Sequence, residues 1–413
     1  MPERGHLEGN PRVLAIGYSG ANNTGAEALL LADVEDLRAV LGPRASITVP
    51  SLNVRNLRRY LREGSGLSIV RMPYVYPAAV WRLVRQHDVL VLVEGSTFMD
   101  TWGSPLLWYY LWAARCARRA GKPCLAYAVD AGDLCAQNRR LTGRIASRMD
   151  LIVVRAKAAA ERLRACKVTA PIEVTADNAL TFVPDSAELS RARASWPEAT
   201  GVVGLAVVNF HLFPVGLRPF ARKADRYQWP YGFSRSRERS RAAAALASSY
   251  AELADWIVEE QGRSVALLCM EELDGPFAAA VRERMRHADR ARIFSSRDYN
   301  ASQMAGLLRS LDPLVTARYH AAVLSLAAAV PQVAAGHDLR LRSLYDELGV
   351  SELCVDPRSP DLVDLLKSPI RRLLADPEPL KATLQRKHEE LLARAKGNRE
   401  HLRAFFSRQG WGS

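Results

Sequence analysis

The chain of 413 residues contains few cysteines and no long apolar run. Its six cysteines form no Cys-x-x-Cys pair and no zinc-ligand spacing, so free thiols in a reducing compartment are expected and a metal site is not. No uninterrupted apolar stretch approaches the roughly 20 residues that cross a bilayer, so no transmembrane segment is expected. The first residues, MPERGHLEGN, lack the apolar core of a signal peptide. These absences favour a cytoplasmic protein.

Positive charge is in excess. The chain has 57 Lys and Arg against 44 Asp and Glu, a formal net charge of +13. This balance suits acidic partners such as nucleic acid, anionic lipid or phosphorylated metabolites. The excess is spread over expected helices, and no helix-turn-helix, zinc-finger or RNA-binding signature supports nucleic acid, which is therefore not expected as a partner. The sequence leaves homo-oligomerisation open.

Short apolar runs alternate with helical patterns along both halves of the chain, which predicts parallel sheets covered on both faces. The chain is too long for one ordinary core, and the pattern loosens near residues 185–200, so the expected fold class is α/β with two Rossmann-like domains. The expected parts are an N-terminal tail (1–10), an N-terminal domain (11–190), a C-terminal domain with the donor site (200–375) and a helical tail (376–413). The expected strand segments are 12–17, 46–51, 67–72, 88–96, 123–132, 149–155 and 171–178 in the first half, and 201–210, 264–270, 290–294, 313–316, 331–335 and 352–356 in the second.

Two consecutive domains of this kind leave a cleft at the carboxyl ends of their strands, where ligands bind. Four polar loops follow strands of the first half: GYSGANNTGAEALL (17–30), VEGSTFMDTWG (93–103), YAVDAGDL (127–134) and TADNALTF (175–182). The first is not a dinucleotide fingerprint. Glu27 is as well explained as a first-turn helix acid, and Asp177 as a turn former. The candidate cleft residues are Asn22, Asn23, Glu27, Glu94, Ser96, Asp130 and Asp177.

The segment TARYHAAVLSLAAAVP (316–331) places two polar side chains where a buried strand passes into a helix. Alternation puts Arg318 and His320 on the same side of the chain. A helix N-terminus attracts anions, an arginine adds a planar two-donor fork, and a histidine titrates near neutrality. These features indicate an anion site with an acid or base attached. The alternative is structural: Arg318 would form a salt bridge with the other domain and His320 would cap the helix.

One segment, RPFARKADRYQWPYGFSRSRERSR (218–241), breaks the alternation. It mixes basic and aromatic residues, a composition that can stack bases and hold phosphates. Loops of this length also serve as lids over active sites. A lid or acceptor-binding loop, an inert excursion and a nucleic-acid contact all remain interpretations of this segment, the last one the least favoured.

With these pieces in place, the chain resembles the polysaccharide pyruvyl transferase family over most of its length. The matches are GANNTGAEALL to G-N-x-G-(A/D)-E-A, VEGSTFMD to a glycine-rich loop, LIVVRAKAAAERL to L-R-D-x-x-S-x-x-x-L, and TADNAL to T-x-D-P-A. The most specific match is TARYHAAVLSLAAAVP to S-x-R-(F/Y)-H-x-x-I-x-A-x-x-x-x-P. The resemblance implies a GT-B-like fold with a cleft between two domains.

The resemblance also implies an activity: phosphoenolpyruvate delivers its pyruvyl group to two hydroxyls of a glycan or glycosylated metabolite as a ketal. Arg318 would hold the phosphate or carboxylate of this donor, and His320 would protonate its methylene carbon. No cofactor or metal is implied beyond phosphoenolpyruvate as co-substrate. The partners would be this phosphorylated donor and a carbohydrate-containing acceptor.

The chain departs from the family pattern, which marks a divergent member. Asn209 and His211 stand where a second anion-binding arginine is common, and Arg218 or Arg222 would have to replace it. Two alternatives stay open. One is a GT-B-type sugar-nucleotide glycosyltransferase, for which Glu271 and Glu272 would hold a ribose; the other is a catalytically inactive binding protein on the same fold.

Overall fold

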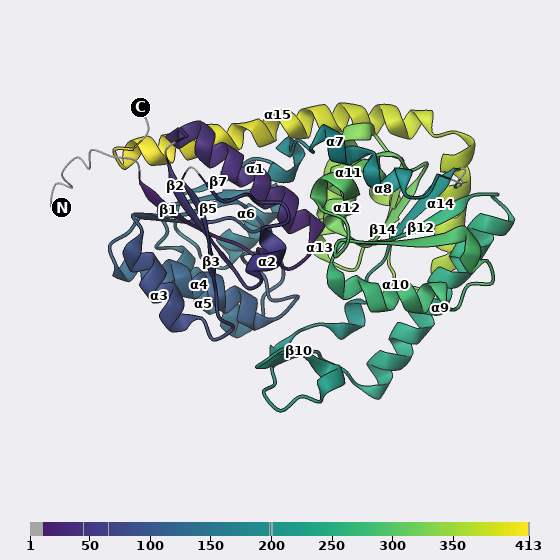
Figure 1. Ribbon diagram of the computed structural model, residues 1–413, viewed down its shortest axis with the longest axis horizontal. Helices are drawn as coiled ribbons and strands as arrows, with labels where there is room; N and C mark the ends of the chain where they lie inside the picture. The colour runs from purple at the N-terminus through teal and green to yellow at the C-terminus, as the bar shows by residue number, and fades with distance from the viewer. Residues whose placement is uncertain (1–10, 44, 65, 198, 200, 412–413) are drawn as a thin grey trace.

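The computed structural model describes residues 11–43, 45–64, 66–197, 199 and 201–411. The expected N-terminal tail, 1–10, lies outside the described residues. The chain forms two lobes, each built around its own parallel sheet, and the lobes lie side by side (Figure 1). This architecture confirms the predicted α/β fold class. The chain passes from the first sheet to the second between residues 174 and 202.

The first lobe contains a seven-stranded parallel sheet in the order β3-β2-β1-β4-β5-β6-β7. Apart from Arg12 at its start, β1 is apolar because both faces of the sheet are covered: its alternate residues enter two different core clusters, Leu14 and Ile16 one of them and Val13 and Ala15 the other. The strands are β1 (Arg12–Ile16), β2 (Ser46–Ser51), β3 (Leu67–Arg71), β4 (Val89–Leu92), β5 (Cys124–Val129), β6 (Leu151–Val154) and β7 (Ile172–Val174). The helices are α1 (Thr24–Leu41), α2 (Val54–Leu57), α3 (Pro77–Gln86), α4 (Ser104–Arg119), α5 (Ala136–Ala146) and α6 (Lys157–Ala165).

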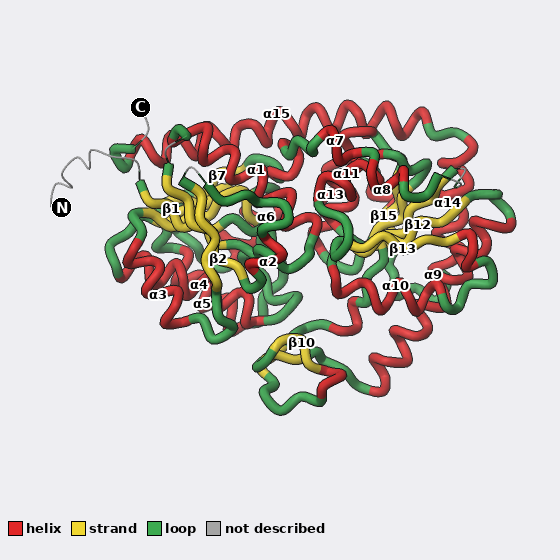
Figure 2. The backbone as a smooth tube through the Cα atoms, in the orientation of Figure 1, coloured by secondary structure: helices red, strands yellow, loops and turns green. Residues whose placement is uncertain are grey.

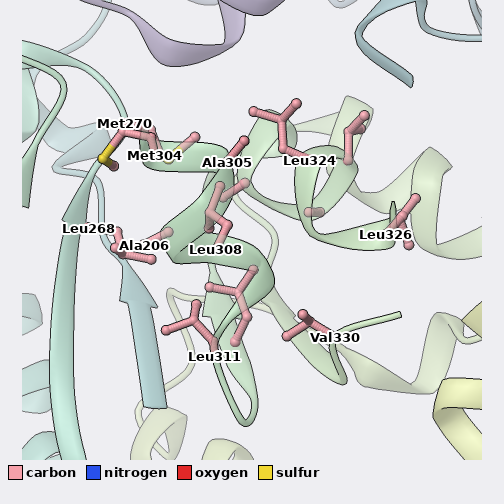
Figure 3. Close-up of a cluster of buried hydrophobic side chains, with 14 of the residues drawn as sticks. Ala206, Leu268, Met270, Met304, Ala305, Leu308, Leu311, Leu324, Leu326 and Val330 are labelled. Carbon is pink, nitrogen blue, oxygen red and sulfur yellow. The ribbon is translucent and has the colours of Figure 1, made fainter. Parts of the chain in front are cut away.

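The second lobe contains a six-stranded parallel sheet in the order β13-β12-β8-β14-β15-β16. Leucines such as Leu308, Leu311 and Leu324 pack over one of its faces (Figure 3). The strands are β8 (Val202–Ala206), β12 (Ser264–Cys269), β13 (Ala291–Ser295), β14 (Leu314–Thr316), β15 (Gln332–Ala335) and β16 (Cys354–Val355). The helices are α7 (Ser186–Leu189), α8 (Arg191–Ala194), α9 (Arg237–Glu259), α10 (Gly275–Arg282), α11 (Ala301–Arg309), α12 (Tyr319–Ser325), α13 (Leu339–Leu348) and α14 (Leu362–Ala375).

Each sheet reverses its strand order once, between β1 and β4 in the first lobe and between β8 and β14 in the second. Loops that leave neighbouring strands in opposite directions open a crevice at such a switch point. Every strand segment expected from the sequence contains a strand, so hydrophobic alternation was sufficient to locate both sheets.

An insert, residues 213–235, lies between β8 and α9 and projects below the two lobes in Figure 1. It carries a three-stranded antiparallel sheet in the order β10-β11-β9, which the sequence did not predict. The insert also touches the first lobe, because Val215 N donates to Trp102 O over 2.7 Å. Gly103 permits this approach: its φ is 142°, and a Cβ there would lie 2.1 Å from Val215 O. The insert strands are β9 (Gly216–Leu217), β10 (Arg226–Gln228) and β11 (Tyr231–Gly232).

The last helix, α15 (Glu378–Arg408), runs along both lobes (Figures 1 and 2). Leu384 and Leu391 join the core of the second lobe, whereas Phe405 and Phe406 join the core of the first. Between these two ends, Asn398 Nδ2 donates to Ala176 O over 3.0 Å. The helix therefore packs on both lobes at once. Among the described residues, no helix is both long and apolar enough to cross a membrane.

Candidate active site

A cavity lies between the lobes, at the carboxyl ends of β1, β4 and β14, in a space of about 1500 Å³ that includes open solvent. Its wall contains both polar or charged and aromatic side chains. The polar residues are Ser19, Asn23, Glu94, Ser96, Glu271, Arg318, His320, His337, Asp338 and Arg340, and the aromatic ones are Tyr18, Tyr74, Tyr76, Trp102, Tyr109, Phe213, Tyr227, Tyr231 and Tyr319. We call this space the interlobe cavity.

His320 lines the cavity in the first turn of α12, one residue after that helix begins. Its Nε2 lies 3.6 Å from Oδ2 of Asp177 in the first lobe and has no hydrogen-bond partner among the described residues. The imidazole also packs against α1, because a Cβ on Gly25 would lie 2.1 Å from its Nδ1. His320 does not cap the helix: the N-cap is Arg318, without a side-chain cap bond. The imidazole is thus held from two sides, by Asp177 and by α1.

Asp177 is itself held by a fully buried arginine that the sequence analysis did not single out. Arg155 donates from Nη1 to Asp177 over 2.5 Å and from Nε to Asp130 over 2.8 Å, and its guanidinium lies 4.0 Å from the ring centre of Tyr319. Burial alone would raise the pKa of Asp177, but Arg155 and His320 hold that pKa well below its ordinary value. The group opposite His320 is therefore a carboxylate at neutral pH, and an imidazolium there would face a negative charge.

Arg318 lines the cavity, but its guanidinium faces two carboxylates instead of open space. Nη1 lies 3.1 Å from Glu271 Oε2, and Nη2 pairs with Asp274. Burial by itself would lower the pKa of Arg318, but these two carboxylates raise it above its ordinary value. The free anion-binding fork expected from the sequence is therefore occupied. The partners also come from the lobe of Arg318 itself, and not from the other lobe as in the structural alternative.

Arg340, which the sequence analysis missed, stands in the first turn of α13 and lines the same cavity. It donates to Ser96 Oγ over 3.1 Å, pairs with Asp338 over 2.7 Å, and lies 5.3 Å from the ring centre of Trp102. Its position in the sequence could have indicated it, because Arg340 stands at the start of the helix that follows β15, as Arg318 stands at the start of the helix that follows β14. Arg340 therefore supplies a cation that shares its charge with one carboxylate, where Arg318 shares its charge with two.

His337 is buried beside Arg340, and both of its ring nitrogens lack a hydrogen-bond partner within the described ranges. Burial lowers the pKa of His337 to about 4, and the guanidinium groups of Arg318 and Arg340 act in the same direction. The ring is therefore neutral near pH 7 and offers one donor and one acceptor.

The candidate residues of the first lobe divide between the cavity and its surroundings. Asn23, Glu94 and Ser96 line the cavity. Asp130 and Asp177 stand behind it, on either side of Arg155. Asn22 and Glu27 instead join the lobes: Asn22 Nδ2 donates to Glu272 over 2.6 Å, and Glu27 accepts from Ala301 N over 3.1 Å.

The proposed substitutes for a second donor arginine lie elsewhere. Asn209 and His211 line a neighbouring cavity, which shares Tyr18 and Tyr227 with the interlobe cavity. Arg218 and Arg222 are exposed on the insert and line neither cavity. Over the described ranges, no three His, Cys, Asp or Glu side chains gather as metal ligands would.

The comparison with family models decides the family. A model described as polysaccharide pyruvyl transferase matches residues 23–338, which include the loop at Asn23, the Asp177 segment and the Arg318–His320 segment. The chain belongs to the polysaccharide pyruvyl transferase family, a transferase family. The resemblance drawn from the motifs is thereby confirmed. Curated protein sequences contain no match.

Solved structures confirm the GT-B-like fold at very low sequence identity. Anabaena HepE in complex with UDP aligns with a TM-score of 0.57 at 12% identity, over 96% of this chain and 100% of that one. UDP-GlcNAc 2-epimerase of Neisseria meningitidis, bound to UDP-GlcNAc, aligns with a TM-score of 0.60 at 10% identity, over 96% and 100%. S. aureus MnaA with UDP gives 0.59 at 10% identity, over 96% and 97%. At these identities the likeness establishes the fold alone.

Proposed function

We propose that this protein transfers the pyruvyl group of phosphoenolpyruvate to two hydroxyls of a carbohydrate-containing acceptor, as a ketal. The observation that carries the proposal is His320, which lines the interlobe cavity while its buried Nε2 faces the ionised Asp177 over 3.6 Å. Membership of the family supports the same chemistry. Phosphoenolpyruvate serves as co-substrate, no further cofactor takes part, and the reaction belongs in the cytoplasm.

In this mechanism the imidazolium of His320 donates a proton to the methylene carbon of phosphoenolpyruvate, which leaves oxocarbenium character on the adjacent carbon. One acceptor hydroxyl adds to that carbon and returns its proton to His320. The carbon–oxygen bond to phosphate then breaks, the second hydroxyl closes the ketal, and its proton leaves with the phosphate. Asp177 stabilises the charged imidazole throughout, because its carboxylate remains ionised.

The two kinds of side chain in the cavity wall suit the two substrates. Arg340, Ser96 and the neutral His337 offer donors for the carboxylate or phosphate of phosphoenolpyruvate, the role first expected of Arg318. The aromatic residues offer flat apolar faces on which sugar rings pack. Trp102 contacts both kinds of side chain, because Arg340 lies over its ring and Phe213 of the insert lies at a ring-centre distance of 4.6 Å.

A specific observation also favours a second candidate, sugar-nucleotide-dependent glycosyl transfer. Glu271 lines both cavities, which is where a ribose-binding carboxylate would stand, and the similar structures of HepE and MnaA contain UDP. However, Glu271 is already paired with Arg318 and accepts from Tyr18 Oη over 3.2 Å. A protein that keeps the fold for binding alone is the third candidate.

Calorimetric titration separates these candidates without knowledge of the acceptor. Phosphoenolpyruvate, UDP-sugars and GDP-sugars are titrated into the wild type, Arg340→Ala and Arg342→Ala. Arg342 is the matched control, because it lies two residues further along α13 and pairs with Asp356 outside the interlobe cavity. We expect phosphoenolpyruvate to bind the wild type and Arg342→Ala, and to bind Arg340→Ala about tenfold or more weakly. Binding of nucleotide sugars without binding of phosphoenolpyruvate would overturn the proposal.

A further inference from the structure

The outer end of the insert exposes three large apolar side chains. Phe220 is 97% exposed, Leu217 63% and Trp229 56%. Leu217 and Trp229 are neighbours, because Arg218 N donates to Pro230 O over 2.8 Å, and Phe220 follows in the turn that Ala221 N closes on Arg218 O over 3.0 Å. Single exposed apolar residues are ordinary on a protein surface, whereas a cluster of them marks a contact site.

The same end of the insert carries cations without ion-pair partners. Arg218, Arg222, Lys223 and Arg226 are all exposed, and none of them forms an ion pair in the part of the chain that the structure describes. The one acidic residue of the insert, Asp225, is already paired with Arg235 over 3.4 Å. The apolar cluster is therefore surrounded by unbalanced positive charge.

The inner side of the insert contacts the lobes and the interlobe cavity. Tyr227 and Tyr231 line the interlobe cavity, and the hydroxyl of Tyr227 lies 2.5 Å from that of Tyr18 in the first lobe. Tyr231 Oη donates to Tyr74 O over 3.3 Å. The inner aromatic residues thus fasten the insert to the lobes, and neither the cavity nor the packing of the insert accounts for the outer cluster.

We propose that the outer end of the insert, residues 217–229, docks the protein on an anionic lipid bilayer. Trp229, Phe220 and Leu217 enter the boundary between headgroups and acyl chains, and the four cations contact lipid phosphates. A bilayer is favoured over nucleic acid because the sequence contains no nucleic-acid-binding signature, and because Leu217, unlike Phe220 and Trp229, has no ring on which a base can stack. The assignment is independent of the proposed reaction and is tested without substrate.

Co-sedimentation with vesicles tests the docking directly. Purified full-length protein is mixed with vesicles of phosphatidylcholine alone, or with about one third phosphatidylglycerol. We expect binding only to the anionic vesicles, with weakening by salt, and a blue shift of tryptophan emission that Trp229→Phe removes. Absence of binding to both kinds of vesicle would overturn the proposal.

Surface variants with matched controls identify the binding residues. Phe220→Ser with Trp229→Ser should weaken binding to anionic vesicles about tenfold or more, whereas Val183→Ser, at a position 85% exposed but outside the insert, should leave it unchanged. Thermal melting of each variant confirms that it is folded. Equal binding of the double variant and the wild type would contradict the proposal.

A charge series separates docking from general attraction. Arg222→Glu with Lys223→Glu should reduce anionic vesicle binding about tenfold or more. Arg140→Glu with Arg144→Glu makes the same change in net charge on exposed residues of the first lobe, and should reduce it far less. Equal losses in both pairs would mean that net charge alone attracts the vesicles. Insert-dependent binding to a single-stranded oligonucleotide, without vesicle binding, would assign the surface to nucleic acid instead.

Discussion

Two aspartates share Arg155, but only one of them faces the proposed acid. Asp130 and Asp177 both accept from its guanidinium, while Nε2 of His320 lies 3.6 Å from Asp177 alone. A comparison of the two aspartates therefore distinguishes two roles that Asp177 combines. One role is to satisfy a buried arginine, which is structural. The other is to stabilise an imidazolium, which is part of catalysis.

The first prediction concerns this difference. Asp177→Asn should lower kcat about 100-fold or more with little change in the KM for phosphoenolpyruvate, because the charge opposite His320 is lost. Asp130→Asn, which removes a partner of the same arginine, should cost mainly stability. Steady-state kinetics of phosphate release and thermal melting measure both. Equal kcat losses in the two variants would show that Asp177 acts only through Arg155.

The second prediction concerns pH. Glu27 is buried between the lobes, with Oε1 3.6 Å from Arg59 Nη2, and burial raises its pKa to about 8 although Arg59 and the bond from Ala301 N act in the opposite direction. Between the ordinary value of 4.5 and about 8, the folded protein holds this proton while the unfolded chain releases it, so stability falls as the pH rises through that window. Glu27→Gln should therefore raise Tm by a few degrees at about pH 9 and change it little near pH 5. The control is Glu35→Gln, an exposed position on the same helix; a gain for Glu27→Gln that did not depend on pH would refute the account.

At the scale of elements, the start of α1 positions the site. Asn23 caps this helix, and its second residue, Gly25, leaves space for the imidazole of His320 from the other lobe. The loop before the helix also bonds to the second lobe, with Thr24 N donating to Met270 O over 2.8 Å. The contacts of the GANNTGAEALL motif with the second lobe therefore explain its glycine and asparagine residues, without a role in binding phosphate.

The third prediction follows from the contact between Gly25 and His320. Gly25→Ala places a Cβ 2.1 Å from Nδ1 of His320, so the ring must move, and a displacement of about 1 Å at a catalytic group can cost roughly 100-fold in rate. Gly397→Ala in α15 is the control, because a Cβ there meets nothing within 4 Å. It should leave the rate unchanged and stabilise the helix slightly. Phosphate release by the two variants measures the effect; an unaltered rate in Gly25→Ala would contradict the placement of His320.

Elements were predictable from the sequence to different degrees. Long buried strands such as β5 and β12 are almost entirely apolar, so their pattern alone locates them. The insert strands are two or three residues long and held by a few backbone bonds, so their sequence contains no alternation to read. Arg340 was missed because the sequence LRLRSL reads as an ordinary amphipathic helix.

At the scale of the whole molecule, the site depends on how the lobes are joined. His320 and Asp177 belong to different lobes, as do Arg340 and Ser96. The sequence places His320, Asp177 and Ser96 at the ends of strands, which predicts that they approach one cleft, whereas Arg340 was missed. It does not predict which side chains meet, because no local pattern encodes the angle between two separately folded sheets. The pairing of Arg318 with Glu271 and Asp274 could not be predicted from the sequence for a related reason: contacts between neighbouring loops depend on the conformations of those loops.

The fourth prediction tests the role of α15 in holding the lobes together. Phe406 is fully buried in the core of the first lobe, and Leu384, on the same helix, is buried in the core of the second. Phe406→Ala should lower the free energy of unfolding by about 3–5 kcal/mol, because it leaves a cavity. Arg403→Ala, at an exposed position of the same helix, should change it little. Chemical denaturation measures both; a small effect of Phe406→Ala would mean that α15 lies on the first lobe without stabilising it.

The central claim is that His320 drives pyruvyl transfer from phosphoenolpyruvate. The most direct measurement is phosphate release from phosphoenolpyruvate in the presence of a panel of glycosides, with detection of the ketal product, for the wild type and His320→Gln. The account predicts that at least one glycoside stimulates release by the wild type, and that His320→Gln binds phosphoenolpyruvate normally but releases phosphate about 100-fold or more slowly. Equal rates in the two proteins, or release of UDP or GDP from nucleotide sugars in place of phosphate, would contradict it.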